Sequence, residues 1–161
     1  MAKVWLITGS GNGLGRDIAE AALAAGDSVV AGARRTQELA PLVAQYGERV
    51  KPVALEVCEE AAAKAAVQLA VDTFGRLDVL VNNAGYGHEG ILEESPLAEL
   101  IHQFEVNVFG AVAMIKAVLP AMRRRRRGHI INITSMAGYI GMPGSRTTAA
   151  VSLPSKELQK P

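Results

Sequence analysis

The chain has 161 residues, of which 49% are hydrophobic and 20% charged, and its formal net charge is +1. This composition predicts one soluble domain that is long enough to bury a core, and the near-neutral charge gives no general attraction to nucleic acid or to a membrane. The single cysteine, Cys58, excludes an internal disulfide framework and has no nearby partner for a metal site. A reducing, cytoplasmic location is therefore expected, and no signal peptide or membrane span is expected.

The first predicted unit is a strand, a glycine-rich turn and a helix. An apolar run at 4–7 precedes Thr8-Gly9-Ser10-Gly11-Asn12-Gly13-Leu14-Gly15, and apolar residues at helical spacing follow. Glycine is needed where the backbone takes a positive φ or lies against a ligand, and the N–H groups at the start of a helix attract an anion. The turn therefore predicts a phosphate or pyrophosphate site. The alternative is a glycine-rich turn that holds no ligand.

The spacing of these glycines distinguishes the turn from two other phosphate-binding turns. Gly9, Gly13 and Gly15 form G-x-x-x-G-x-G, which differs from the G-x-G-x-x-G of the common dinucleotide-binding fold. No Lys-Ser or Lys-Thr pair follows, so the turn is not a Walker loop.

Strands and helices alternate along the rest of the chain. Strands are expected at 28–33, 50–57, 77–81 and 129–135, and helices at about 37–46, 59–74 and 96–127. Gly75 is expected to end the helix before it, and Pro120 to kink or divide the last helix. The alternation predicts an α/β fold with a doubly wound parallel sheet of about five strands, in which ligands bind at the carboxyl ends of the strands.

Four ordered motifs at these strand ends resemble the short-chain dehydrogenase/reductase family. The resemblance covers about residues 3–145, and it implies a Rossmann-like NAD(P)-binding domain that transfers a hydride between the cofactor and a small-molecule carbonyl or alcohol. The motifs are the glycine turn Thr8–Gly15, Asn82-Asn83-Ala84-Gly85, Asn107 in Asn-Val-Phe-Gly, and Ile131-Asn132-Ile133-Thr134-Ser135.

The resemblance also implies roles for these residues. The turn, with Thr8, Gly9, Ser10, Asn12, Gly13, Leu14 and Gly15, would hold the cofactor pyrophosphate. The segment with Asn83, Ala84 and Gly85 would border the adenine ribose and the nicotinamide. Asn107 would hold a water in the proton relay, and Ser135 would hydrogen-bond the substrate oxygen.

The residues after the second and third strands predict which nicotinamide cofactor binds. An NAD site usually has an acidic residue after the second strand, but this chain has Arg34 and Arg35. Guanidinium groups bind a phosphate well, so NADP is favoured over NAD. The alternative is two solvated arginines at a strand end. Glu56 and Val57 are expected beside the adenine, with Glu56 where the family commonly has an aspartate.

The family's catalytic Tyr-x-x-x-Lys is absent from this sequence. The family spacing from Ser135 places the tyrosine at Thr148 and the lysine at Ser152. A shift of reading frame within residues 147–161 can encode a tyrosine and a lysine in that register, which suggests a frameshift near Ser145. The chain is thus expected to have an incomplete domain at 1–145 and an irregular tail at 146–161, without the last strands and helices of the family.

Loss of these elements would leave the fifth strand as an exposed edge and the oligomer interface incomplete. Without the tyrosine and lysine, the chain is expected to be inactive or nearly so. The alternative function is a non-catalytic dinucleotide-binding or interaction module.

Two further features have alternative interpretations. The run Arg123–Arg127 would either bind nucleic acid or form the solvated end of the long helix, where cations complement the dipole, and the second interpretation is favoured. His88-Glu89 would either touch substrate or belong only to a loop, and the loop is favoured.

Overall fold

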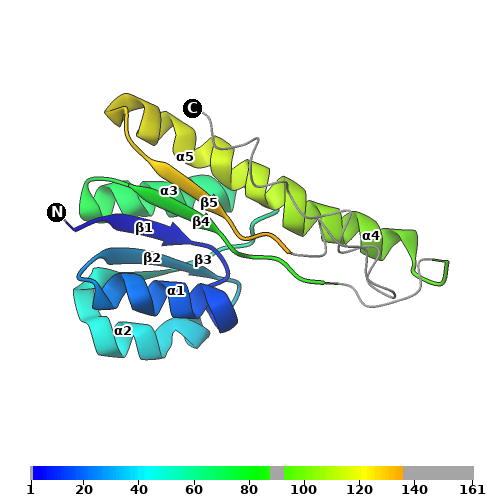
Figure 1. Cartoon of the computed structure of the whole chain (residues 1–161), viewed down its shortest axis with the longest axis horizontal. Helices are drawn as coiled ribbons and strands as arrows, with labels where there is room; N and C mark the ends of the chain where they lie inside the picture. The colour runs from blue at the N-terminus through cyan, green and yellow to red at the C-terminus, as the bar shows by residue number, and fades with distance from the viewer. Residues whose placement is uncertain (1, 88–92, 136–161) are drawn as a thin grey trace.

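The computed structural model describes residues 2–87 and 93–135 of the chain (Figure 1). Its five strands form one parallel sheet in the order β3-β2-β1-β4-β5, which confirms the predicted α/β fold. The strands are β1 (Val4–Ile7), β2 (Ser28–Ala33), β3 (Val50–Ala54), β4 (Val79–Asn82) and β5 (His129–Asn132). The α-helices are α1 (Gly13–Ala24), α2 (Ala40–Tyr46), α3 (Glu60–Phe74), α4 (Leu97–Phe104) and α5 (Ala111–Arg125), with 3₁₀ turns at Thr36–Leu39 and Gly47–Arg49.

Helices cover both faces of the sheet, with α1 and α2 on one side and α3 and α5 on the other (Figure 1). Successive side chains of a strand point to opposite faces, so neighbouring residues enter different cores. Leu6 packs in the core under α3 and α5, whereas Ile7 packs in the core under α1 and α2. Both side chains are fully buried. The central strands β1, β2 and β4 are largely hydrophobic because each is covered on both faces, whereas the edge strands β3 and β5 have exposed residues.

The helix before β5 departs from the sequence prediction. Pro120 was expected to kink or divide it, but α5 continues through this residue as an α-helix. The change of helix type lies earlier, at Glu105–Gly110, which forms a π-helical segment between α4 and α5. Proline removes one backbone N–H donor, and the packing of Val118 and Met122 against the sheet keeps the helix continuous across that loss. The prediction of a division at Pro120 was wrong.

Several predicted elements are shorter in the structure. β3 ends at Ala54 rather than at residue 57, and β5 ends at Asn132 rather than at residue 135. Leu55, Glu56 and Val57, which follow β3, line the groove described below. Gly75 ends α3 in the left-handed conformation, with φ 73°, as predicted. The tail at 146–161 and His88-Glu89 lie outside the described residues.

The helical segment Leu97–Arg125 is long and apolar enough, by length and composition, to cross a membrane. Part of this apolar character belongs to the core, because Met114, Val118 and Met122 are buried against the sheet and α3. Buried residues make up 28% of the most apolar stretch of the segment. The exposed large hydrophobic side chains of the segment Leu97–Arg125 are Leu97, Ile101 and Phe109.

Candidate functional site

The glycine turn lies at the carboxyl edge of the sheet, between β1 and α1 (Figure 1). Backbone bonds fix it to both neighbouring strands, since Thr8 N donates to Val81 O at 3.0 Å and Ser10 N donates to Gly32 O at 2.8 Å. The buried Ser10 hydroxyl closes the turn by donating to Ile7 O at 2.8 Å. The turn is thus held rigidly in place at the centre of the sheet.

The glycines of the turn divide into two groups. An added Cβ on Gly15 would overlap the Gly9 carbonyl and the Asn83 side chain, so this glycine is required for close packing of α1 on the strand. Gly9 is less crowded, with its Cβ position 3.0 Å from Asn83 Nδ2, and has a positive φ of +68°. Gly13 has φ +54° and nothing within 4 Å of its Cβ position. Its open side is the space into which a ligand fits.

The N-terminus of α1 faces this open space. Its first N–H groups have no partner within the helix, and Asn12 at the N-cap makes no side-chain capping bond. Leu14, in the first turn, is 53% exposed. Uncapped N–H groups and the positive end of the helix dipole form an anion site, so the residues present fit a pyrophosphate.

Thr8 links the glycine turn to the segment after β4. Its Oγ1 accepts bonds from Asn83 N at 3.0 Å and Ala84 N at 2.9 Å, and the Asn83 side chain donates back to Thr8 O at 3.0 Å. Asn82 is buried and donates to Asn132 Oδ1 of β5 at 2.9 Å. The Asn-Asn-Ala-Gly motif therefore joins three strands at the edge where the glycine turn lies.

Replacement of Thr8 with valine is expected to lower the free energy of unfolding by about 1–3 kcal/mol, because two partly buried N–H groups would lose their acceptor. Urea denaturation measures the loss. Thr8→Ser is the matched control, since it keeps the hydroxyl and removes only a methyl group. Equal loss in the two variants would show that the hydroxyl does not hold the turn to the Asn83 segment.

The groove beside the glycine turn has a volume of about 670 Å³. It runs from the ends of β2 and β3 to the segment after β4, which brings together most of the predicted cofactor residues. The lining residues include Gly9, Asn12, Gly13, Leu14, Arg34, Arg35, Glu38, Glu56, Val57, Asn83, Ala84, Gly85 and Tyr86. Thr8, Ser10 and Gly15 support the groove from beneath.

The arginines at the end of β2 differ in their contacts. Arg35 donates from Nε to Glu38 Oε1 at 2.6 Å, and its side chain is 78% exposed. Arg34 is exposed and makes no ion pair within the described parts of the chain. One of the two guanidinium groups is thus free, and the other already has a carboxylate partner.

Asn107 lies in the π-helical segment and holds the backbone after Gly85. Its Nδ2 donates to Tyr86 O at 2.8 Å, and its Oδ1 accepts from Tyr86 N at 3.1 Å. Gln103, one turn earlier, is fully buried and donates to the same Tyr86 oxygen at 3.1 Å. Sequence reasoning missed Gln103, and a polar residue within an amphipathic helix was the only signal for it.

Ser135 follows β5 at the same edge of the sheet and is half-buried. Residues 148 and 152, where the family spacing places the tyrosine and lysine, lie outside the described residues. The structure therefore describes the cofactor side of the site and only the beginning of the substrate side.

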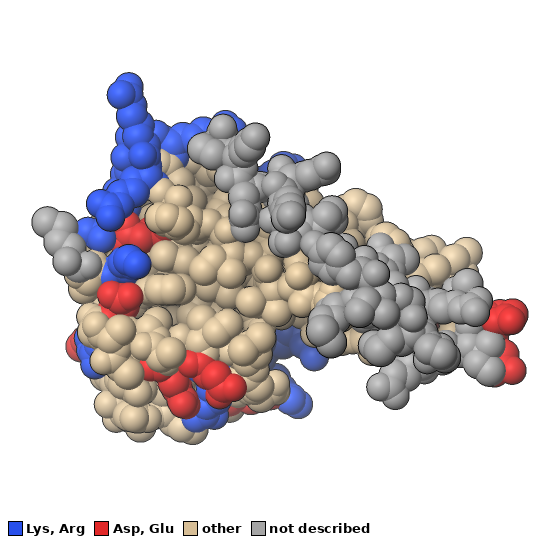
Figure 2. All heavy atoms as spheres, in the orientation of Figure 1, with Lys and Arg blue, Asp and Glu red and all other residues tan. Residues whose placement is uncertain are grey.

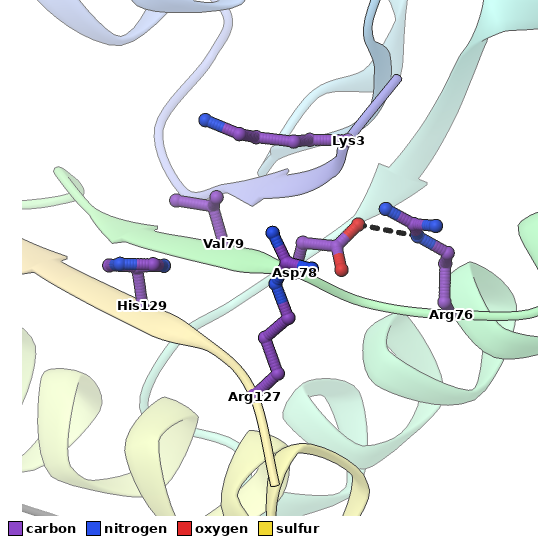
Figure 3. A pocket seen from close by; sticks show the side chains of 6 residues that line it. All are labelled: Lys3, Arg76, Asp78, Val79, Arg127 and His129. Atoms are coloured by element: carbon purple, nitrogen blue, oxygen red, sulfur yellow. Dashed lines mark hydrogen bonds and ion pairs between the residues drawn. The ribbon is translucent and has the colours of Figure 1, made fainter. Parts of the chain in front are cut away.

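A second, smaller hollow of about 100 Å³ lies at the opposite, amino edge of the sheet (Figure 3). At its wall, Asp78 accepts bonds from Val4 N at 2.9 Å, Arg76 Nε at 2.7 Å and Arg125 Nη1 at 2.9 Å. Lys3, Arg127 and His129 also line it. The Asp78 contacts tie the starts of β1 and β4 to the end of α5, which is a structural role.

The arginine run at the end of α5 is exposed, but Arg125 also makes contacts within the fold. Figure 2 shows basic side chains gathered where α5 ends, and residues 123–127 are exposed. Arg125 is an exception to the favoured interpretation, because its guanidinium also donates to Leu77 O at 3.2 Å. Arg126 takes the left-handed conformation, with φ 50°, and ends the helix.

Within residues 2–87 and 93–135, no group of three or more His, Cys, Asp and Glu side chains is placed to hold a metal ion.

A family profile described as short chain dehydrogenase matches residues 3–150 of the sequence. The chain belongs to the short-chain dehydrogenase family. Among curated relatives of this family, Oxidoreductase BOA17 of Botryotinia fuckeliana is 47% identical over 145 residues, which cover 89% of this chain and 53% of that protein. The chain thus spans about half the length of this relative.

Solved structures of short-chain dehydrogenases have the same fold. One structure, from Streptomyces avermitilis, has a TM-score of 0.89 and 43% identity. The match covers 94% of this chain and 55% of that chain. ElxO with NADP bound has a TM-score of 0.88 and 30% identity, over 94% of this chain and 62% of its own. A short-chain dehydrogenase/reductase from Burkholderia phymatum in complex with NAD has a TM-score of 0.88 and 32% identity. The match covers 93% of this chain and 55% of that chain.

Proposed function

We propose that the groove at the carboxyl edge of the sheet binds NADP(H). The observation that carries the proposal is that an uncapped helix N-terminus, the open side of Gly13 and the arginines after β2 all face one groove. Family membership and the dinucleotide complexes of similar proteins support a nicotinamide dinucleotide as the ligand. NADP is proposed over NAD because Arg34 and Arg35 stand where an acidic residue would bind a ribose hydroxyl.

The proposed roles follow the length of the groove. The N–H groups at 13–15 would hold the pyrophosphate, Glu56 and Val57 would lie beside the adenine, and Asn83–Gly85 would border the ribose and nicotinamide. Asn107 and Gln103 fix the backbone of Tyr86 and thereby the position of that segment. When bound, the cofactor supplies or accepts a hydride.

On the substrate side, Ser135 would hydrogen-bond the oxygen of a small-molecule carbonyl or alcohol, and Asn107 would hold a water of the proton relay. A tuned proton donor is also needed. Tyr86 is a poor candidate, because burial raises the pKa of its hydroxyl and the nearby carboxylates of Glu99 and Glu105 raise it further. Since Tyr-x-x-x-Lys is absent, we propose that this sequence binds the cofactor without turnover.

Fluorescence titration with NADPH, followed by an oxidation assay with a panel of carbonyl compounds, tests the proposal. Saturable binding without NADPH oxidation is the expected result. A second chain, which follows the shifted reading frame from residue 147 and continues in that frame beyond residue 161, is expected to gain turnover because it restores the tyrosine, the lysine and the elements after them. Turnover by the unaltered chain would contradict the proposed inactivity, and lack of NADPH binding would contradict the proposed function.

A non-catalytic dinucleotide-binding or interaction module is the second candidate. The reading frame of the tail distinguishes this candidate from the oxidoreductase. A gain of turnover in the replaced chain indicates an oxidoreductase ancestor with an active site.

We further propose a cytoplasmic location and an incomplete oligomer interface. Sedimentation of the unaltered and the replaced chains tests the interface, since only the replaced chain is expected to form a stable oligomer.

A further inference from the structure

Glu38 lies inside the groove at the end that would receive the adenine ribose. It belongs to the 3₁₀ turn Thr36–Leu39, three residues after Arg35, and its side chain is only 29% exposed. The carboxylate accepts from Arg35 Nε at 2.6 Å, and Arg35 Nη2 contacts the same oxygen. The second carboxylate oxygen points to the glycine turn, since an added Cβ on Gly11 would overlap it. Gly11 therefore leaves room for a negative charge between Arg35 and the turn.

This position gives the carboxylate opposite effects on the two forms of the nucleotide. A 2′-phosphate that approaches Arg35 has to compete with Glu38 for the guanidinium, and the two anions repel each other. A 2′-hydroxyl can donate a hydrogen bond to the carboxylate, which only accepts. Among residues 2–87 and 93–135, Arg34 has no such counter-ion, so it is available to a phosphate in either case.

We infer that Glu38 is a specificity-determining residue that neutralises Arg35 and thereby weakens the preference for a 2′-phosphorylated nucleotide. The inference rests on the proposed function, because it concerns the same groove. It predicts a site that discriminates less strongly against a 2′-hydroxyl than two adjacent arginines alone would suggest. Removal of the charge, with the side-chain shape kept, should therefore sharpen the discrimination.

Calorimetric titration of Glu38→Gln with adenosine 2′,5′-bisphosphate and with AMP tests the inference without any need for turnover. An exposed ion pair contributes up to about 1 kcal/mol, so the ratio of the two affinities is expected to rise by about fivefold in favour of the bisphosphate. Glu48→Gln is the matched control, because Glu48 also pairs with a cation three residues away, Lys51, and lies outside the groove. This control is expected to leave the ratio unchanged.

Arg35→Gln in both backgrounds completes the test. The effect of Glu38→Gln should shrink when Arg35 is absent, because the carboxylate then has no guanidinium to neutralise and acts only directly on the phosphate or the hydroxyl. Persistence of the full effect without Arg35, or an unchanged or lower ratio in Glu38→Gln, would overturn the inference. Wild-type binding of neither probe would instead overturn the proposed function, together with the inference that rests on it.

Discussion

Gly13→Ala is expected to weaken dinucleotide binding strongly while the fold is kept. The residue has φ +54° and nothing within 4 Å of its Cβ position, so an added methyl group enters the space beside the N-terminus of α1. There it would meet the pyrophosphate and displace it from the helix N–H groups. Hydrogen bonds to charged groups contribute about 1.5–3 kcal/mol each, so an affinity loss of about a hundredfold is expected.

A methyl group added at a second glycine separates the effect on binding from the effect on stability. Gly26→Ala is the matched control, because Gly26 also has a positive φ, +90°, and open surroundings, but lies outside the groove. Both variants should lose about 1–2 kcal/mol of stability from the left-handed conformation, and only Gly13→Ala should lose binding. NADPH titration and urea denaturation of each protein give the two readouts. Wild-type affinity in Gly13→Ala would show that no phosphate lies against the turn.

Gly15→Ala is expected to behave in the opposite way. Its added Cβ would overlap the backbone of Gly9 and the Asn83 side chain, so α1 has to move away from the strand. Overpacking of this kind costs about 1–3 kcal/mol, and binding should weaken as a consequence of the displaced helix. The two substitutions together test whether the glycine turn has a ligand-facing side and a packing side.

The sequence was sufficient to predict this turn because its signal is local. The positions of Gly9, Gly13 and Gly15 relative to one strand and one helix determine which of them packs and which is open. The alternation of apolar runs likewise predicted the parallel sheet, since each strand and each covering helix has its own period. The fold class and the glycine turn therefore required no knowledge of contacts between distant segments, whereas the groove residues Glu56, Val57 and Asn83–Gly85 were predicted from the family resemblance.

Features that depend on distant contacts were not predicted. Glu38 and Gln103 look like ordinary surface residues of helical segments, and only the folded chain brings them to Gly11 and to Tyr86 O. The π-helical segment at Glu105–Gly110 was also missed, because Pro120 gave a stronger local signal for a break. Asp78 was read as a residue within a strand, with no indication that α5 supplies it with an arginine.

Asp78→Asn is expected to lower the free energy of unfolding by about 2–4 kcal/mol at neutral pH. The carboxylate is 5% exposed and receives bonds from Val4 N, Arg76 and Arg125. Loss of its charge leaves two arginines without a counter-ion at the amino edge of the sheet. Breaking a buried ion pair costs about 3–5 kcal/mol, and the partial exposure of the arginines reduces that figure.

The loss should also depend on pH. Burial raises the pKa of the Asp78 carboxyl, but the bonds from Val4 N, Arg76 and Arg125 outweigh it, so the pKa lies below its ordinary value of 3.8. A depressed pKa stabilises the fold above the ordinary value, and this stabilisation disappears as the pH falls through the folded-state pKa. The difference between wild type and Asp78→Asn should therefore be largest above about pH 5 and shrink in acid.

Urea denaturation of both proteins from pH 7 to pH 3 measures this difference. Glu48→Gln is again the control, because Glu48 pairs with Lys51 at the surface, where solvent screens the pair, and its removal should change stability little at any pH. A loss in Asp78→Asn that stays constant down to pH 3 would indicate that the shape of the side chain, rather than its charge, holds the starts of β1 and β4 to α5. A loss that narrows in acid would assign the basic amino edge a structural role, separate from the nucleotide groove at the carboxyl edge.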